Sequence, residues 1–188
     1  MNTEIIFIAD ESGSMSVIKH DANGAFDQFV SEQRAIEGEC RMSLTTFANE
    51  PQVRYEARDI KEVPPLDLHP SGNTALFDAI GVTMNRQGER IAREKWADLV
   101  ILAVITDGQE NASREYSLPV IRTMIEHAES NGWKVMYLAS GQDAFKAAAN
   151  IGSKSMLAAS VGLGGAGQRA AYSYASEQTT SLRTGKTP

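Results

Sequence analysis

The chain has 188 residues, enough for one globular domain that buries roughly two thirds of the surface its unfolded form exposes. Hydrophobic residues make up 42% and charged residues 22% of the sequence, which is ordinary for a globular protein. The formal net charge of −6 argues against a nucleic-acid surface, because such surfaces normally carry a basic face.

Cysteine usage and the termini point to the same compartment. Cys40 is the single cysteine, so an internal disulfide is excluded and a reducing compartment is indicated. We interpret it as a small core side chain. Residues 1–9 are too short and too acidic for a signal peptide, and no window approaches the ~18 apolar residues of a membrane span. The sequence therefore predicts a soluble, cytoplasmic protein.

Strand and helix signals alternate along the chain. Apolar runs predict strands at residues 4–9, 41–48, 52–57, 97–106, 133–139 and 155–161. Apolar residues at helical spacing predict helices at residues 16–36, 73–93, 117–131, 143–150 and 168–182. We expect Val17, Phe26, Phe29 and Val30 on the apolar side of the first helix, which Gly38 ends in a left-handed conformation.

Alternating strands and helices indicate a mostly parallel sheet with helices on both faces. The turn at residues 49–51 joins two strands as a hairpin, which supplies one antiparallel edge strand. Residues 63–70 are rich in proline and predict an irregular connection. The predicted fold class is α/β, doubly wound, with a central sheet of about six strands.

Three polar segments lie at the ends of these predicted elements. Asp10, Ser12 and Ser14 follow the first strand in the run DESGS, Thr74 ends the run SGNT before the second helix, and Asp107 lies in the run TDG after the fourth strand. Ligands of such sheets bind at the carboxyl ends of the strands. Two carboxylates and three hydroxyls suit a hard divalent cation such as Mg²⁺, which takes six oxygens near ~2.1 Å. The natural sixth ligand is an acidic side chain of another protein.

Each segment alone has a plainer interpretation. Asp10 and the two serines are equally typical of a turn that caps the next helix. Thr74 alone indicates a hydroxyl at the start of a helix, and Asp107 before glycine indicates a turn. Their joint occurrence at strand ends that the topology brings together favours the metal site. Glu11 and Glu110 flank it, and we interpret both as solvated loop carboxylates.

The three segments together resemble the von Willebrand factor A (vWA) domain and its metal-ion-dependent adhesion site (MIDAS). That family combines Asp-x-Ser-x-Ser, a Thr in a glycine-containing loop before a helix, and an Asp in a Thr-Asp-Gly turn. The resemblance covers residues 3–160, and the expected residue type occupies every ligand position. It implies that Ser12, Ser14 and Thr74 contact Mg²⁺ or Mn²⁺ directly, that Asp10 and Asp107 act largely through water, and that a partner carboxylate completes the shell.

The resemblance implies a vWA/Rossmann-like domain at residues 1–162, followed by a C-terminal helix and polar tail at residues 163–188 on the same domain. It also implies a non-catalytic, metal-dependent protein-binding module whose partner presents a Glu or Asp, with no nucleic acid or membrane involved. Intracellular bacterial and phage members often work beside AAA-type ATPases, so such an ATPase is one candidate partner. The alternatives are a metal-dependent phosphoesterase that uses the same ion, and a site that only stabilises its loops.

Other motifs carry less weight. The run GLGGAG at residues 162–167 matches dinucleotide-binding loops, but no strand and no acidic residue follow at the required distance, so we expect a flexible hinge. His20, His69 and His127 lack the spacing of a zinc site. An aspartyl-phosphate phosphatase has an acidic residue, its general acid, at the position that Ser12 occupies. Ser14 is not part of the nucleophile elbow of serine hydrolases, so neither enzyme class is well supported.

The C-terminal helix, near residues 168–182, has small residues and two tyrosines. We expect it to pack on the sheet, with a mobile partner-binding arm as the alternative. The polar end after Thr179 is predicted to be disordered.

Overall fold

The computed structural model describes residues 1–140, 157–161 and 164–185. Its strands are β1 Thr3–Asp10, β2 Cys40–Phe47, β3 Pro51–Asp59, β4 Leu99–Thr106, β5 Lys134–Ser140 and β6 Leu157–Val161. Its α-helices are α1 Lys19–Arg34, α2 Leu76–Glu94, α3 Leu118–Ser130 and α5 Gly165–Thr184, and its 3₁₀ turns are η1 Gly13–Val17 and η2 Ile60–Glu62. The helix predicted at residues 143–150 lies outside the described residues.

The described strands form a six-stranded sheet in the order β3-β2-β1-β4-β5-β6. β1 pairs in parallel with both β2 and β4, and only the β2–β3 pair is antiparallel. The predicted α/β class, the mostly parallel sheet and the antiparallel edge strand are thereby confirmed. The chain leaves β1 toward β2 and later returns to its other side as β4, so the strand order reverses there, which is where such sheets bind ligands.

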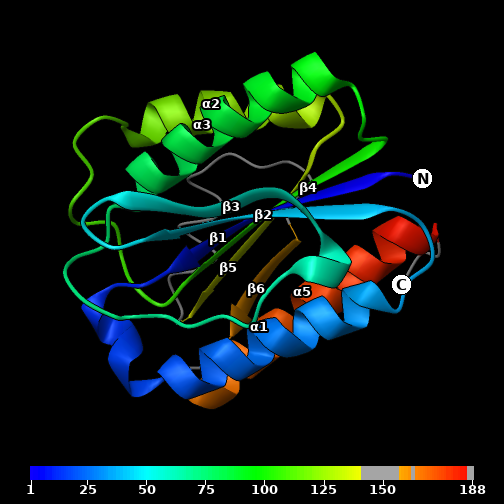
Figure 1. Cartoon of the computed structure of the whole chain (residues 1–188). Coiled ribbons are helices and arrows are strands. Elements are labelled where there is room, and N and C mark those ends of the chain that lie inside the picture. The colour runs from blue at the N-terminus through cyan, green and yellow to red at the C-terminus, as the bar shows by residue number, and fades with distance from the viewer. Residues whose placement is uncertain (141–156, 162–163, 186–188) are drawn as a thin grey trace.

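Helices cover both faces of the sheet, α2 and α3 on one and α1 and α5 on the other (Figure 1). All eight residues of β1 are buried, because its two faces contact different helix layers. Ile5 and Phe7 belong to the cluster with α1 and α5, whereas Ile6 and Ile8 belong to the cluster with α2 and α3. This alternation explains why the first strand reads as a continuous apolar run.

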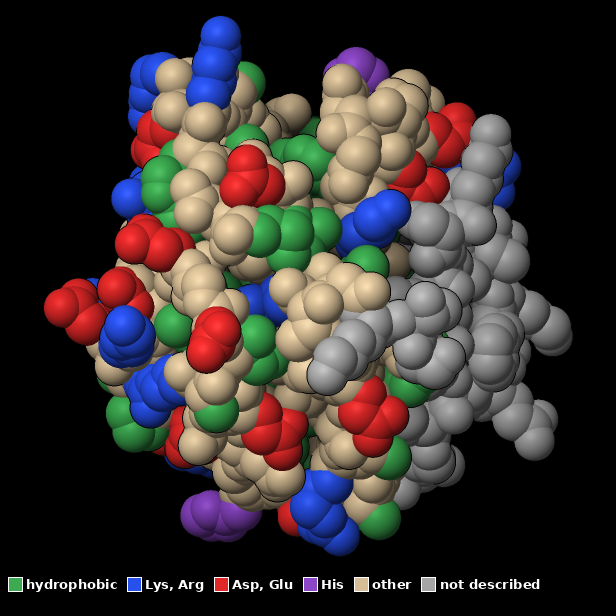
Figure 2. Space-filling view, turned by 90° about the vertical axis from the view of Figure 1, so that its right-hand side faces the viewer, with side chains coloured by type: hydrophobic (Ala, Val, Ile, Leu, Met, Phe, Trp, Pro, Cys, Tyr) green, Lys and Arg blue, Asp and Glu red, His purple; other side chains and the backbone are tan. Residues whose placement is uncertain are grey.

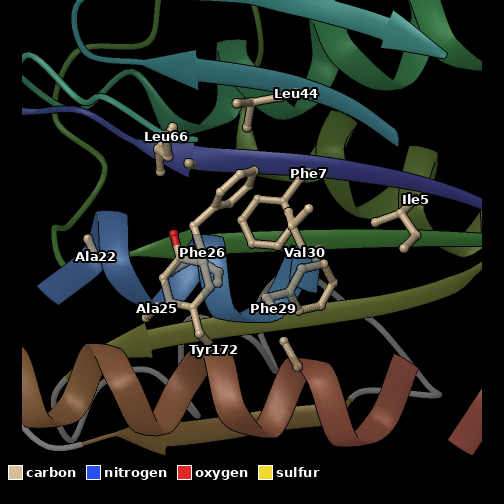
Figure 3. Close-up of a cluster of buried hydrophobic side chains, with 14 of the residues drawn as sticks. Ile5, Phe7, Ala22, Ala25, Phe26, Phe29, Val30, Leu44, Leu66 and Tyr172 are labelled. Carbon is tan, nitrogen blue, oxygen red and sulfur yellow. The ribbon is translucent and has the colours of Figure 1, made fainter. Parts of the chain in front are cut away.

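The C-terminal helix α5 packs into the core through Tyr172. Its ring stacks on Phe7 with centroids 5.6 Å apart and meets Phe26 edge-on at 6.4 Å (Figure 3). Near the end of α5, Arg183 is buried and donates a hydrogen bond of 2.7 Å to the carbonyl of Gln33 in α1. The expected disorder after Thr179 is therefore wrong for the rest of α5, because this end of the helix packs against α1.

The first predicted helix is divided in the structure. Its beginning is the separate turn η1, and α1 starts only at Lys19. Val17, expected on the apolar side, is instead 89% exposed, because the tighter turn points it away from the sheet. α1 ends at Arg34, and Gly38, with φ of +102°, lies in the connection that follows rather than at the helix end.

Two other helix starts also differ from the prediction. α2 begins at Leu76 rather than at residue 73, because the backbone of Ala75 is not helical, with ψ of 62°. The amides of Asn73 and Thr74 bond to side chains of other loops. α5 begins at Gly165, within the glycine run predicted to be a hinge, and its first turn lies against Asp21 of α1. Packing between α1 and α5 thus overrides the local preference of these glycines.

A charged side chain is buried at the amino end of β1. Glu4 is fully buried, and its Oε1 accepts hydrogen bonds from Arg90 (2.6 Å) and Ser43 (3.2 Å). Its Oε2 has no hydrogen-bond partner among the residues that the structure describes. Burial raises the pKa of Glu4 even though the Arg90 guanidinium opposes the shift. This carboxylate was not anticipated in a strand that otherwise reads as apolar.

The surface at this amino end is mixed in charge. Figure 2 shows acidic and basic side chains interspersed over the part of this face that the structure describes. Within the described ranges, no helix is long and apolar enough to cross a membrane. The distinctive chemistry of the domain lies at the opposite end of the sheet.

If α5 is an integral part of the core, Tyr172→Ala should lower the free energy of unfolding by about 3 kcal/mol or more, because it leaves a cavity beside Phe7 and Phe26. Urea denaturation measures this loss. The adjacent Ser173→Ala is the control, since Ser173 is exposed on the same helix. Equal stabilities of the two variants would show that α5 does not contribute to the core.

The buried Glu4 should also give a pH-dependent signature. Because its pKa in the folded protein is raised above 4.5, the stability that Glu4 contributes falls as the pH rises from that value toward neutrality. The stability of Glu4→Gln minus that of the wild type should therefore increase over this range. Urea denaturation at successive pH values measures it, and a constant or decreasing difference would contradict the assignment.

Candidate metal centre

The predicted site residues converge at the carboxyl ends of β1 and β4, on the left side of Figure 1. Asp10 is the last residue of β1, and Asp107 directly follows β4, its neighbour in the sheet. Ser12 and Ser14 lie at the start of the turn η1, and Thr74 lies just before α2. Parallel pairing brings the two strand ends to one edge, and the intervening loops follow them there.

Asp10 is held by protein donors on both oxygens. Its Oδ1 accepts from the amide of Ser12 at 2.7 Å, and its Oδ2 accepts from the hydroxyl of Thr106 at 2.5 Å. The side chain is only 1% exposed. Asp10 thus shapes the loop and joins the ends of β1 and β4, while adding a negative charge beneath the surface.

The two serines connect to the second aspartate. The hydroxyl oxygens of Ser12 and Ser14 are 3.1 Å apart, and Ser14 donates to Asp107 Oδ1 at 2.7 Å. Ser12 is buried, Asp107 is half-buried and Ser14 is exposed. These oxygens form a continuous line from the buried loop to the solvent.

The hydroxyl of Thr74 lies next to Gly108, the residue that follows Asp107. A Cβ at Gly108 would lie 3.0 Å from Thr74 Oγ1 and 3.7 Å from Asp10 Oδ2, so both oxygens lie beside this glycine. A larger residue would crowd them. The glycine of the TDG run therefore lets the loop after β4 approach the loop before α2 closely.

The two aspartates share an unfavourable electrostatic environment. Burial raises the pKa of Asp10, against hydrogen bonds from Thr106 and Ser12. Burial likewise raises the pKa of Asp107, and the charge of Asp10 raises it further, against the hydrogen bond from Ser14. A cation beside both carboxylates would relieve this repulsion and favour their ionised forms.

The donor set fits a hard cation. Within the described parts of the chain, no group of three His, Cys, Asp or Glu side chains is placed to hold a metal. An ion here would depend on two carboxylates and three hydroxyls, all oxygen donors. Such a set suits Mg²⁺ or Mn²⁺ and lacks the nitrogen or sulfur ligands that zinc prefers.

Glu11 is not the solvated carboxylate that we expected. It is 7% exposed and binds the guanidinium of Arg54 through both oxygens, at 2.8 and 2.7 Å. It also accepts from the amide of His69 at 2.5 Å. Burial alone would raise the pKa of Glu11, but these bonds outweigh it and hold the pKa below its usual range. Glu11 thus connects the loop that carries Ser12 and Ser14 to β3 and to the segment before Thr74.

The interpretation of Glu110 as a solvated carboxylate is also wrong. Glu110 is half-buried, and its Oε2 accepts from the amide of Phe77 at 2.9 Å and the hydroxyl of Ser113 at 2.6 Å. Its Oε1 accepts from the amides of Ala112 and Ser113 at 2.9 and 2.7 Å. Glu110 therefore ties the loop after β4 to the first turn of α2.

Two further side chains support this junction and were missed from the sequence. Asp78, in the first turn of α2, accepts from three successive backbone amides, at residues 114–116, at 2.8 to 2.9 Å. The Asn111 side-chain oxygen accepts from the backbone amide of Thr74 at 2.9 Å, and the backbone N–H of Asn111 donates to the Thr74 carbonyl at 3.1 Å. An acidic residue in a first helical turn is a recognisable cap signal, but the amides that Asp78 binds belong to another loop, and no signal near Asn111 indicates its role.

The oxygen-rich cluster lies at the reversal point of a doubly wound sheet, where α/β domains of this class bind their ligands. The family model of the von Willebrand factor type A domain matches residues 4–166. The chain belongs to this family, whose members are typically protein-interaction modules and usually non-catalytic. No curated protein matches the chain.

Several solved structures share the fold. The vWF domain of the type V pili tip protein Mfa5 from Porphyromonas gingivalis has a TM-score of 0.65 at 11% identity, over 100% of this chain and 97% of that one. The SpRpn10 VWA domain has a TM-score of 0.60 at 14% identity, and the match covers 86% of this chain and 89% of that one. Proximal thread matrix protein 1 from the mussel byssus has a TM-score of 0.61 at 17% identity, and the match covers 96% of this chain and 45% of that one.

These likenesses establish the fold alone, because the sequences have diverged so far. This chain spans only 45%, 41% and 43% of the mussel protein and of two microbial vWA proteins, from Sulfolobus acidocaldarius and Catenulispora acidiphila. The activities of those longer proteins therefore do not transfer directly.

Glu110→Ala should loosen the loop after β4, because it leaves several amide donors without an acceptor. We expect a loss of about 1–3 kcal/mol in the free energy of unfolding and faster proteolysis within residues 107–117. The control is Gln109→Ala, since Gln109 is the exposed neighbour. Equal cleavage rates in the two variants would exclude an anchoring role for Glu110.

Proposed function

We propose that this domain is a metal-dependent protein-binding module. In this proposal, Asp10, Ser12, Ser14, Thr74 and Asp107 hold Mg²⁺, or Mn²⁺ in its place, and a partner protein contributes a Glu or Asp carboxylate. The observation that supports it best is the line of oxygens from Ser12 through Ser14 to Asp107, with the Asp10 carboxylate buried behind it. By family resemblance, an AAA-type ATPase is one candidate partner.

The residues divide into a buried and an open part. Asp10 has both oxygens committed to protein donors, so its role is to supply charge and to orient the Ser12 loop. Ser14 is exposed and Asp107 half-buried, so the solvent side of the site is open to a partner. A bound divalent cation would offset the two aspartate charges and supply the positive centre that attracts an anionic ligand.

Metal binding should be visible in thermal stability. For EDTA-treated protein, Mg²⁺ or Mn²⁺ at ten times its dissociation constant should add about 1.4 kcal/mol, a rise of roughly 3–6 °C in melting temperature. Ser14→Ala should weaken metal affinity about tenfold or more. Ser16→Ala is the matched control, because Ser16 is an exposed serine in the same turn whose hydroxyl donates to the Gly13 carbonyl rather than to a predicted ligand.

Two results would overturn parts of the proposal. An unchanged melting temperature in the wild type, with either ion, would contradict a metal site formed by this chain alone. Turnover of p-nitrophenyl phosphate that requires Mg²⁺ and is lost in Ser14→Ala would favour the phosphoesterase instead. The binding module predicts a metal-induced rise in melting temperature without turnover.

A further inference from the structure

A polar recess of about 880 Å³ lies beside the candidate metal centre. It is bordered by the β2–β3 turn, the loop before α2 and the loop after β4. The polar side chains around it include Asn49, Glu50, Asn73, Asn111, Arg114 and Glu115. None of them is among the five predicted ligands, and the proposed function leaves this recess unused.

Two of its asparagines have a fixed orientation. Asn49 Oδ1 accepts from the amide of Asn73, and Asn111 Oδ1 accepts from the amide of Thr74, each at 2.9 Å. Because a backbone amide can only donate, each of these contacts identifies the carboxamide oxygen and therefore the opposite NH₂ group. Among the described residues, neither NH₂ group makes a hydrogen bond. The recess thus has two oriented donors available to a ligand.

The recess adjoins the candidate metal centre next to Thr74. Its lining residues Asn49 and Asn111 hold the amides of Asn73 and Thr74, and the Thr74 hydroxyl lies beside Gly108, as does the Asp10 carboxylate. Gly72 makes this arrangement feasible, since it has φ of +69° and a Cβ there would lie 2.7 Å from Asn49 Nδ2. A partner segment that binds the metal and continues toward Asn73 would therefore reach the recess.

The charges around the recess indicate which acceptor it suits. Asp78 also borders it, but its carboxylate is already bonded to three backbone amides. Arg114 is exposed on the rim, and Glu50 and Glu115 oppose its charge there. The two NH₂ donors are neutral, and the charged side chains around them are of both signs. Such surroundings favour an uncharged hydrogen-bond acceptor over a second anion. The carbonyl groups of an extended peptide chain are such acceptors.

We propose that this recess binds the main chain of the partner, at residues next to the acidic side chain that completes the metal shell. This inference rests on the proposed function and deepens it. The partner is then an extended, acid-containing peptide segment, read by its carboxylate at the metal and by its backbone carbonyls at Asn49 and Asn111. The flanking side chains of the partner are left free to vary at this position.

The test uses displayed twelve-residue peptides with a fixed central Glu, selected on the wild-type protein in Mg²⁺, and fluorescence polarisation of the peptides obtained. Asn49→Asp keeps an oxygen that can accept from Asn73, removes the NH₂ donor and adds a negative charge. It should weaken peptide binding about tenfold without changing the metal-induced shift in melting temperature. Gln52→Glu is the matched control, because it makes the same change at an exposed site on the same hairpin.

A second measurement leaves the protein unchanged. Replacing one peptide amide by an ester weakens its carbonyl as an acceptor, so an ester at one or two positions beside the Glu should lower affinity for the wild type. The same ester should have little further effect on Asn49→Asp. Such coupling would support main-chain recognition, and an ester scan without effect on the wild type would overturn it.

The two proposals fail in different ways. If no peptide binds the wild type in a metal-dependent manner, the proposed function is overturned and this inference with it. If peptides bind through the metal but Asn49→Asp and Gln52→Glu affect them equally, only the recess inference is overturned.

Discussion

The hydrogen bond from the Thr106 hydroxyl to the Asp10 carboxylate connects the ends of the two central strands. β1 and β4 are neighbours in the sheet but more than ninety residues apart in sequence, and the strand order reverses between them. The loops that follow these strands carry Ser12, Ser14 and Asp107. Their meeting therefore depends on the parallel pairing of β1 and β4, since segments so far apart in sequence cannot meet through contacts between sequence neighbours.

Carboxylates at this end of the sheet fall into two groups with different roles. Glu11, Asp78 and Glu110 are each bonded to backbone amides, and Glu11 also to Arg54. They hold the loops in place. Asp10 and Asp107 each accept from a hydroxyl, Asp10 also from the amide of Ser12, and the charge of Asp10 raises the pKa of Asp107. Since all five side chains are acidic, their partners decide which ones stabilise the protein and which ones suit a cation.

The comparisons separate the scaffold from its use. Solved vWA structures match this fold at 11–17% identity, so the layered sheet tolerates extensive sequence change. The parts that distinguish one such domain from another are then the loops at the carboxyl ends of the strands. In this chain those loops combine an oxygen-rich centre with a recess bordered by asparagine side chains, and Asn111 of the recess holds the amide of Thr74.

The sequence by itself determined the fold class, the alternation of strands and helices, and the run of residues from Asp10 to Ser14. These features are encoded locally, by apolar periodicity and by short motifs, and local signals can be read without the structure. The tertiary structure alone decided that Glu11 and Glu110 are anchored, that Val17 is exposed, and that the end of α5 is ordered around Arg183. The state of a charged or polar side chain depends on partners that lie tens of residues away in sequence, and only the order of the strands brings those partners into contact.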